Sequence, residues 1–84
     1  MSESAGKRVY PSEEGWLALG EPGTYGCDRD GVWWAHVPAP GCPVAALSEH
    51  MVTEHEDGTI TVTPSILWPG KWHGFLERGI WREC

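Results

Sequence analysis

The sequence predicts a small, mainly β protein. We expect a curled antiparallel sheet, shaped as a barrel-like roll or a sandwich, of about six short strands in hairpins with at most one short helix. Two observations predict this class. Turn-forming pairs that end in glycine separate short segments rich in aromatic and β-branched residues. One such segment, residues 59–63, alternates strictly between polar and apolar side chains, as a half-buried strand does.

The length of 84 residues suits a single hydrophobic core. Residues 1–14 are polar, mixed in charge and contain Pro11, which predicts a flexible leader, and residues 15–84 form the single β domain. Six tryptophans stand beside one Phe and two Tyr, so tryptophan is the main core-building residue. Because six exceed what so small a core needs, the alternative use of the surplus is an aromatic platform for a ligand.

The first elements surround an Asp-Gly turn. Residues 16–19 form the first apolar run, either a strand or one helical turn. The turn Asp28–Gly31 then joins residues 25–27 to residues 32–37 in a hairpin, because Asp-Gly supplies the positive φ angles of a tight turn. Residues 38–43 contain three prolines, which remove backbone donors, so we expect irregular structure there.

The middle of the chain predicts a short helix followed by a second hairpin. Residues 44–50 could form about two helical turns, with Pro43 at the first helical position. The turn Glu56–Gly58 joins residues 51–55 to the alternating strand 59–63. We expect Pro64 and Ser65 to end that strand.

The last part of the chain predicts a third hairpin. Residues 68–70, Trp-Pro-Gly, read as a turn. Residues 72–77 then pair with residues 80–82 through Arg78-Gly79, a weaker turn signal because only its second residue is glycine.

Net charge and cysteine content limit the class of partner and the cellular compartment that we expect. A formal charge of −6 argues against direct nucleic-acid binding, and any partner steered by charge would be basic. No apolar run is long enough to span a membrane, and the N-terminal residues lack the apolar segment of a secretory signal. Three cysteines at irregular spacing predict reduced thiols rather than a disulfide framework. We therefore expect a cytoplasmic protein.

Candidate binding residues come from the surplus tryptophans, from the acidic turn and from two polar residues near the last hairpin. The acidic turn belongs to a segment, residues 49–57, that holds no Lys or Arg. Its plain interpretation is a solvated hairpin edge, and the alternative is an acidic surface for a basic protein. The full set of candidates is Trp33, Trp34, Glu54, Glu56, Asp57, Ser65, Trp68, Trp72 and His73.

Metal binding and catalysis have weaker support. Zinc sites normally use closely spaced pairs such as Cys-x-x-Cys, and no two cysteines are close here, so Cys42 and His73 are only weak ligand candidates and no cofactor is expected. Ser65, His73 and Glu77 supply the residue types of a catalytic triad, but Ser65 lies outside the Gly-x-Ser-x-Gly elbow. We expect Ser65 to satisfy local backbone groups where the strand ends.

The C-terminal half, residues 32–84, resembles a family of small uncharacterised proteins of tailed bacteriophages and prophages, some of which carry the misleading name ammonia monooxygenase. The motifs that carry the resemblance are Thr-x-x-Pro-Ser-Ile at residues 61–66 and His-Gly-Phe at residues 73–75. Longer relatives place Cys immediately before the His and a Cys-Pro-x-Cys knuckle upstream. This chain has Trp72 and only Pro40-Gly41-Cys42 at those places, so a zinc site of the relatives would be degenerate here. The resemblance implies a phage or prophage origin and a location in the host bacterial cytoplasm.

These observations together predict a non-enzymatic phage or prophage accessory protein that acts by binding a protein, which the net charge favours as basic. The first alternative is a module that binds a small ligand or a metal such as zinc and uses His73, Cys42 and Ser65. The second alternative is a small enzyme. The sequence leaves the oligomeric state open.

Overall fold

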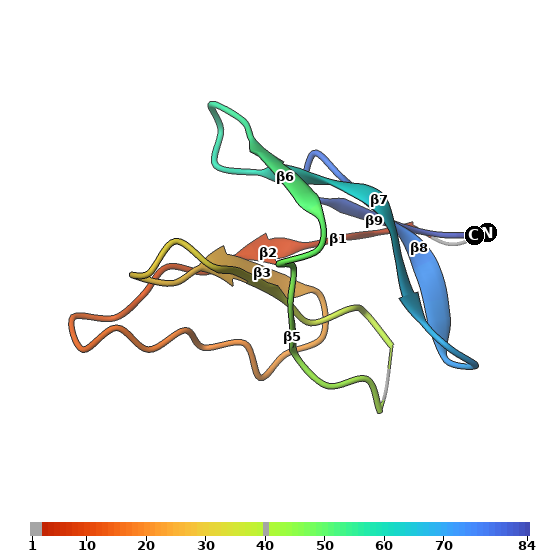
Figure 1. The fold of residues 1–84 in the computed structure, drawn as a ribbon, viewed down its shortest axis with the longest axis horizontal. Helices are drawn as coiled ribbons and strands as arrows, with labels where there is room; N and C mark the ends of the chain where they lie inside the picture. Colours follow the sequence, from red (N-terminus) through yellow and green to blue (C-terminus); the bar gives the residue numbers. More distant parts are fainter. Residues whose placement is uncertain (1–2, 40) are drawn as a thin grey trace.

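The computed structural model describes residues 3–39 and 41–84. Within these residues the chain forms nine short β-strands and no helix, divided between a five-stranded and a four-stranded sheet that do not close into a barrel (Figure 1). The mainly β class predicted from the sequence is confirmed. Residues 1–2 of the predicted leader, and Pro40 of the predicted irregular segment, lie outside the described residues.

The two sheets differ in their pairing. The five-stranded sheet is antiparallel throughout. In the order in which they pair, its strands are β1 (Glu3–Ala5), β9 (Ile80–Glu83), β8 (Trp72–Glu77), β7 (Ile60–Trp68) and β6 (Met51–Glu54). The four-stranded sheet consists, again in pairing order, of β2 (Lys7–Arg8), β3 (Thr24–Cys27), β4 (Trp33–Ala35) and β5 (Ala45–Ala46). Its first pair, β2 with β3, is parallel, and the other two are antiparallel.

All three predicted hairpin turns form. Gly31 and Gly58 take φ angles of 84° and 87°, which close the β3–β4 and β6–β7 turns. The third turn needs a positive φ at two residues, Arg78 at 46° and Gly79 at 78°. The backbone N–H of Arg78 donates to Oγ1 of Thr61 at 3.0 Å, which helps to hold this residue in the left-handed region. The positions of the three hairpin turns could therefore be predicted from the residues within each turn.

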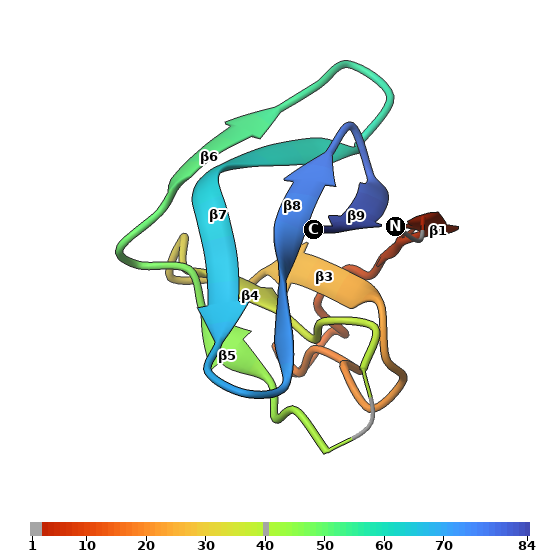
Figure 2. The ribbon, with the colours of Figure 1, turned by 90° about the vertical axis from the view of Figure 1, so that its right-hand side faces the viewer.

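Strand β7 is longer than predicted. Ile60 and Val62 are buried and Thr61 and Thr63 point to the other face, as the alternation predicted. The prediction that Pro64 ends the strand is wrong, because β7 continues to Trp68. Its pairing with β8 shifts register between Val62 and Ile66, so that the proline, which has no N–H, sits where the ladder is interrupted. Figure 2 shows the sharp bend in this strand.

Residues 44–50 do not form the short helix that the sequence allowed. Ala45 and Ala46 instead form β5 and pair with β4, and the next residue, Leu47, donates its N–H to the carbonyl of Trp33 at 2.8 Å. The side chain of Leu47 is 4% exposed and belongs to the core. Two helical turns are marginal on their own, so pairing to a neighbouring strand and burial of Leu47 decide the conformation.

The N-terminal segment joins the two sheets. Residues 3–8 lie in the predicted leader, and they form β1 at the edge of one sheet and β2 at the edge of the other. Gly6 lies between the two strands and donates its N–H to the carbonyl of Gly79 at 2.7 Å. A Cβ at Gly6 would lie 2.9 Å from Nε1 of Trp81 and from Cε2 of Tyr25, so only glycine lets the backbone pass this close to the core.

One hydrophobic core fills the space between the sheets, and Trp81 lies at its centre. Its side chain is 1% exposed and meets Trp72 edge-to-face, with ring centroids 5.6 Å apart. Its indole Nε1 donates to the carbonyl of Gly23 at 2.9 Å, just before β3. A side chain of the five-stranded sheet thus supplies a buried hydrogen bond to the chain entering the four-stranded sheet.

We predict that Trp81→Phe lowers the free energy of unfolding by about 2–4 kcal/mol, since it leaves the Gly23 carbonyl without this donor and leaves a void beside Trp72. Urea unfolding followed by far-ultraviolet circular dichroism measures the change. The matched control is Trp16→Phe, where the indole is 74% exposed and the expected change is within about 0.5 kcal/mol. Equal effects at the two positions would contradict the role given to Trp81.

Candidate functional site

The structure distributes the four candidate tryptophans unequally. Trp72 is 4% exposed and belongs to the core, so its ring is not offered to a partner. Trp33 and Trp68 are partly buried and pack against the core. Trp34 is partly buried on the four-stranded sheet and lines a surface hollow. Trp68 and Trp72 line another open hollow, of about 270 Å³, whose walls are mixed polar and apolar. Of the four, Trp34 therefore lines the hollow with the more apolar walls.

The aromatic side chain most open to solvent is Trp16, which was not among the candidates. It is 74% exposed, whereas a ring of this size is usually mostly buried. A tight turn presents it: Ser12 N–H donates to the Trp16 carbonyl at 2.9 Å, and Trp16 N–H donates to Oγ of Ser12 at 3.1 Å. Gly15, at φ 92°, closes the turn. Trp16 is thus held outward by an ordered backbone.

The residues that follow Trp16 are anchored to the body of the protein. Leu19 is buried, and its carbonyl accepts a hydrogen bond from Nδ1 of His36 at 2.8 Å. Leu17 approaches β3 closely, because a Cβ built on Gly26 would lie 3.2 Å from its Cδ2 atom. The segment 16–19, predicted as a strand or a helical turn, is neither, and it runs as an irregular strap along the sheet.

The wall opposite Trp16 is held by Asp28. Its Oδ1 accepts from the backbone N–H of Asp30 at 2.9 Å and of Val32 at 3.0 Å, and its Oδ2 accepts from Nε1 of Trp34 at 2.9 Å. The hydrogen bond from Trp34 and then those from the turn lower the pKa of this carboxyl below its usual value. Asp28 is therefore ionised at neutral pH and fixes both the β3–β4 turn and the Trp34 ring.

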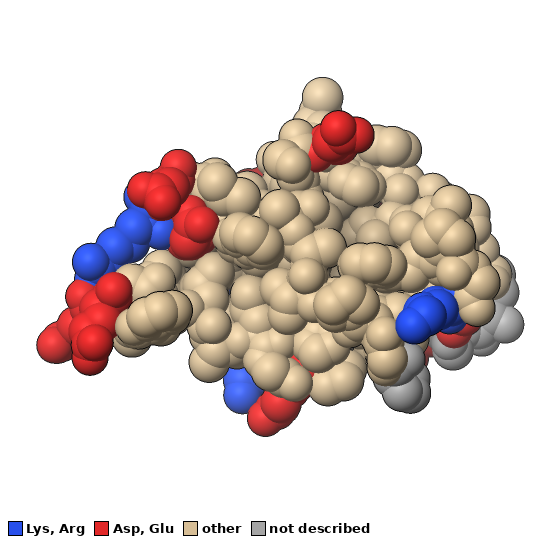
Figure 3. All heavy atoms as spheres, turned by 60° about the horizontal axis from the view of Figure 1, so that its bottom comes forward, with Lys and Arg blue, Asp and Glu red and all other residues tan. Residues whose placement is uncertain are grey.

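Between these two walls lies an open hollow of about 310 Å³ with a mostly apolar lining. Gly15, Trp16, Leu17, Leu19, Asp28, Trp34 and Val44 line it. Val44 is 36% exposed and lies just before β5. Figure 3 shows that the face of the molecule formed by these segments is largely uncharged in its middle. We call this surface the Trp16 face.

Arg29 fastens the two loops at one end of the Trp16 face. Its guanidinium donates to the backbone carbonyls of Ser12, at 3.3 Å, and Glu13. The Arg29 side chain also passes close to Gly15, where a Cβ would lie 3.2 Å from Cδ of the arginine. Because the β3–β4 turn is thereby bound to the Ser12–Trp16 turn, the two walls of the hollow are positioned relative to each other.

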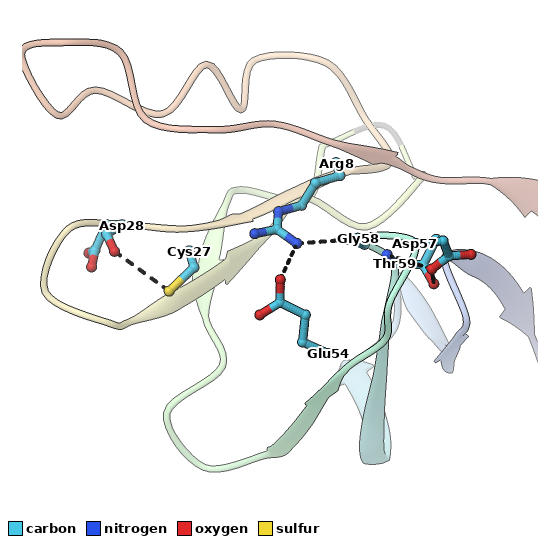
Figure 4. Close-up of polar contacts among 7 residues, drawn as sticks. All are labelled: Arg8, Cys27, Asp28, Glu54, Asp57, Gly58 and Thr59. Atoms are coloured by element: carbon cyan, nitrogen blue, oxygen red, sulfur yellow. Dashed lines mark hydrogen bonds and ion pairs between the residues drawn. The ribbon is translucent and has the colours of Figure 1, made fainter.

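The acidic turn predicted as a contact surface is largely engaged within the protein. Glu54 pairs with Arg8, with Oε2 and Nη1 3.3 Å apart, and Arg8 also donates to the carbonyl of Gly58 at 2.7 Å (Figure 4). Asp57 accepts from the N–H and the hydroxyl of Thr59, and the hydroxyl bond is the main cause that lowers its pKa. Glu56 is exposed. This turn lines an open hollow of about 540 Å³, larger than that of the Trp16 face but walled by charged groups.

Arg8 binds the acidic turn to the four-stranded sheet. Its guanidinium lies between two aromatic rings, 4.5 Å from the centroid of Tyr10 and 4.8 Å from that of Trp33. From β2 of one sheet it reaches the β6–β7 turn of the other, where it meets Glu54 and Gly58. The candidates Trp33 and Glu54 thus both contact Arg8, Trp33 within the four-stranded sheet and Glu54 across to the five-stranded one.

Ser65 and His73 are brought together, on the outer face of the five-stranded sheet. Oγ of Ser65 and Nε2 of His73 are 2.9 Å apart, and His73 is exposed. Glu77 forms an ion pair with Arg82 at 3.1 Å instead of completing a triad with this pair. Cys42, the other weak metal candidate, is 3% exposed and belongs to the core.

The three cysteines are free thiols, two of them at least partly covered. Cys27 lies at the end of β3, where burial raises the pKa of its thiol and the neighbouring Asp28 raises it further. A raised pKa disfavours the thiolate, so the structure gives Cys27 no activation as a nucleophile.

The sequence contained a signal for the Trp16 turn. Ser12-Glu13-Glu14-Gly15 places a serine and a glycine at the two ends of a four-residue turn, with the apolar run beginning directly afterwards. The polar, mixed-charge composition of residues 1–14 masks this signal. The exposure of Trp16 itself had no local signal, because burial of a given ring depends on the assembled sheets.

We predict that Asp28→Asn flattens the dependence of stability on pH in acid. Because the folded-state pKa of Asp28 is lowered, its contribution is present above the unfolded-state pKa of about 4 and is lost as pH falls through the folded-state value. Urea midpoints measured from pH 6 down to pH 2 should therefore fall further for the wild type than for the variant below about pH 4. A difference between the two proteins that stays constant over this range would contradict the prediction.

The described residues hold neither a metal-binding cluster nor a membrane-spanning helix. Among residues 3–39 and 41–84, no three His, Cys, Asp or Glu side chains gather as a metal-binding group. The same residues contain no helix that is long and apolar enough to cross a membrane. No family model, no curated protein and no solved structure matches this chain.

Proposed function

We propose that this protein acts by binding another protein through the Trp16 face, without catalysing a reaction of its own. In the setting that the sequence resemblance implies, it is a phage or prophage product and the partner is a protein of the bacterial host's cytoplasm or of the phage. The observation that carries the proposal is the 74% exposed ring of Trp16 at the rim of an apolar hollow.

The geometry suits a protein contact for two reasons. Trp is enriched among the residues that contribute most to protein interfaces, because one ring buries a large area and loses little side-chain entropy. The Trp16 turn is already ordered by the Ser12 and Arg29 hydrogen bonds, so binding would not have to order it. A shallow, open hollow of about 310 Å³ with an exposed ring fits a protruding side chain of a partner better than an enclosed small molecule.

The outer face of the five-stranded sheet is a weaker candidate. It exposes Met51, Leu67 and Phe75, at 71%, 60% and 38%. These side chains are interspersed with polar residues: His73 lies opposite Leu67, and Arg82 lies opposite Phe75. Single exposed apolar side chains of this kind are normal on soluble proteins and do not by themselves mark an interface.

Site-specific photocrosslinking in a bacterial cytoplasm tests the proposal. With p-benzoylphenylalanine in place of Trp16, we expect a discrete crosslinked product, and the additional change Val44→Gln should strongly reduce its yield by making the hollow polar. The yield is measured by immunoblotting after irradiation, and the product is identified by mass spectrometry.

The matched control carries the same photoreactive residue at Leu67, which is 60% exposed on a different sheet face. We expect no discrete product there. If positions 16 and 67 gave the same products, or if Val44→Gln left the product at position 16 unchanged, binding through the Trp16 face would be refuted.

A further inference from the structure

The carboxylates around the hollow indicate what kind of partner the Trp16 face fits. Glu13 and Glu14 lie in the turn that presents Trp16, and Asp28 and Asp30 lie in the turn that carries the opposite wall. The hydrogen bonds of Arg29 to the Ser12 and Glu13 carbonyls hold the two turns together. Figure 3 shows acidic side chains gathered around a basic one at this end of the molecule, beside the uncharged face.

Three of these carboxylates are available to a partner. Glu13, Glu14 and Asp30 are exposed, and within the described part of the chain no ion pair engages them. The guanidinium of Arg29 is directed to backbone carbonyls, so it offsets only part of the negative charge. Asp28, in contrast, already accepts three hydrogen bonds and serves to position Trp34.

From this arrangement, and resting on the proposed function, we propose that the partner presents a segment rich in Lys or Arg to the Trp16 face. The aliphatic part of one basic side chain lies over the Trp16 ring, which also attracts its cation. The basic groups of the segment pair with Glu13, Glu14 and Asp30 at the rim. The net charge of −6 favours the approach of such a segment from a distance.

Nuclear magnetic resonance with defined peptides tests this partner chemistry. The probes are three acetylated, amidated decapeptides of alternating Leu and X, where X is Lys, Gln or Glu, and the readout is the indole N–H signals of Trp16 and Trp34. We expect the Lys peptide to shift both signals and to bind about five- to tenfold more tightly than the Gln peptide at low salt. The Glu peptide should produce no shift.

Two matched variants separate local charge from total charge. E13Q/E14Q/D30N should reduce binding of the Lys peptide to the level of the Gln peptide. E3Q/E56Q/E77Q, which makes the same change in net charge on the five-stranded sheet and its β6–β7 turn, should leave it within about twofold of wild type. Both variants alter exposed side chains, and their amide spectra verify the fold.

Equal binding of the Lys and Gln peptides, an equal loss in the two variants, or no shift of Trp16 by the Lys peptide would overturn the inference. Any of these results together with a discrete crosslink at position 16 would leave protein binding standing and remove only the basic partner. Absence of that crosslink would remove the proposed function itself, whatever the peptides do.

Discussion

The hydrogen bond from the Trp81 indole to the Gly23 carbonyl is the interaction on which the arrangement of the two sheets most depends. It joins β9 to the entry of β3 inside the core, where an unsatisfied carbonyl would be costly. The ring that donates it also packs edge-to-face on Trp72 and lies beneath Gly6. Placing one large amphipathic side chain at the joint lets sheets of short strands share a single core, which a chain of 84 residues requires.

The rest of the architecture follows from that joint. Because the backbone passes close over Trp81 at Gly6, residues 3–5 can extend one sheet and residues 7–8 the other. Arg8 then emerges where it can reach the β6–β7 turn and lie between Tyr10 and Trp33. Beyond Tyr10 the chain reaches the Ser12–Trp16 turn. The proposed binding face is thus carried on a segment anchored on both sides, by β2 before it and by the buried Leu19 after it.

Local features of the fold could be predicted from the sequence, and features that depend on distant residues could not. The three hairpin turns could be predicted because Gly31, Gly58 and Gly79 readily adopt the positive φ angles that such turns need. Strand β1 was not, because it exists only through pairing with β9 at the other end of the chain. Strand β5 likewise depends on β4, and its two alanines carry little propensity of their own.

The same division applies to the candidate site. Trp34 was one of four candidate tryptophans, but nothing local in the sequence distinguished it from the buried Trp72 or indicated the exposure of Trp16. The burial of Trp72 had a partial signal, since it alternates in phase with Gly74 and Leu76, all three of which are buried. The acidic turn was identified as a charged segment, but its use as an internal partner of Arg8 depends on the packing of two sheets. Which rings and charges remain free is a property of the assembled fold.

Folding commits Trp81 to the joint between the sheets and leaves Trp16 exposed, which the proposed binding face requires. Hydrogen exchange of the six indole N–H groups, followed by nuclear magnetic resonance in the native state, tests this division of roles most directly. We expect Trp81 to exchange only through global unfolding, Trp16 to exchange fastest, and Trp34, whose indole donates to Asp28, to exchange at an intermediate rate. Exchange of Trp81 as fast as that of Trp16, or strong protection of Trp16, would contradict this division of roles.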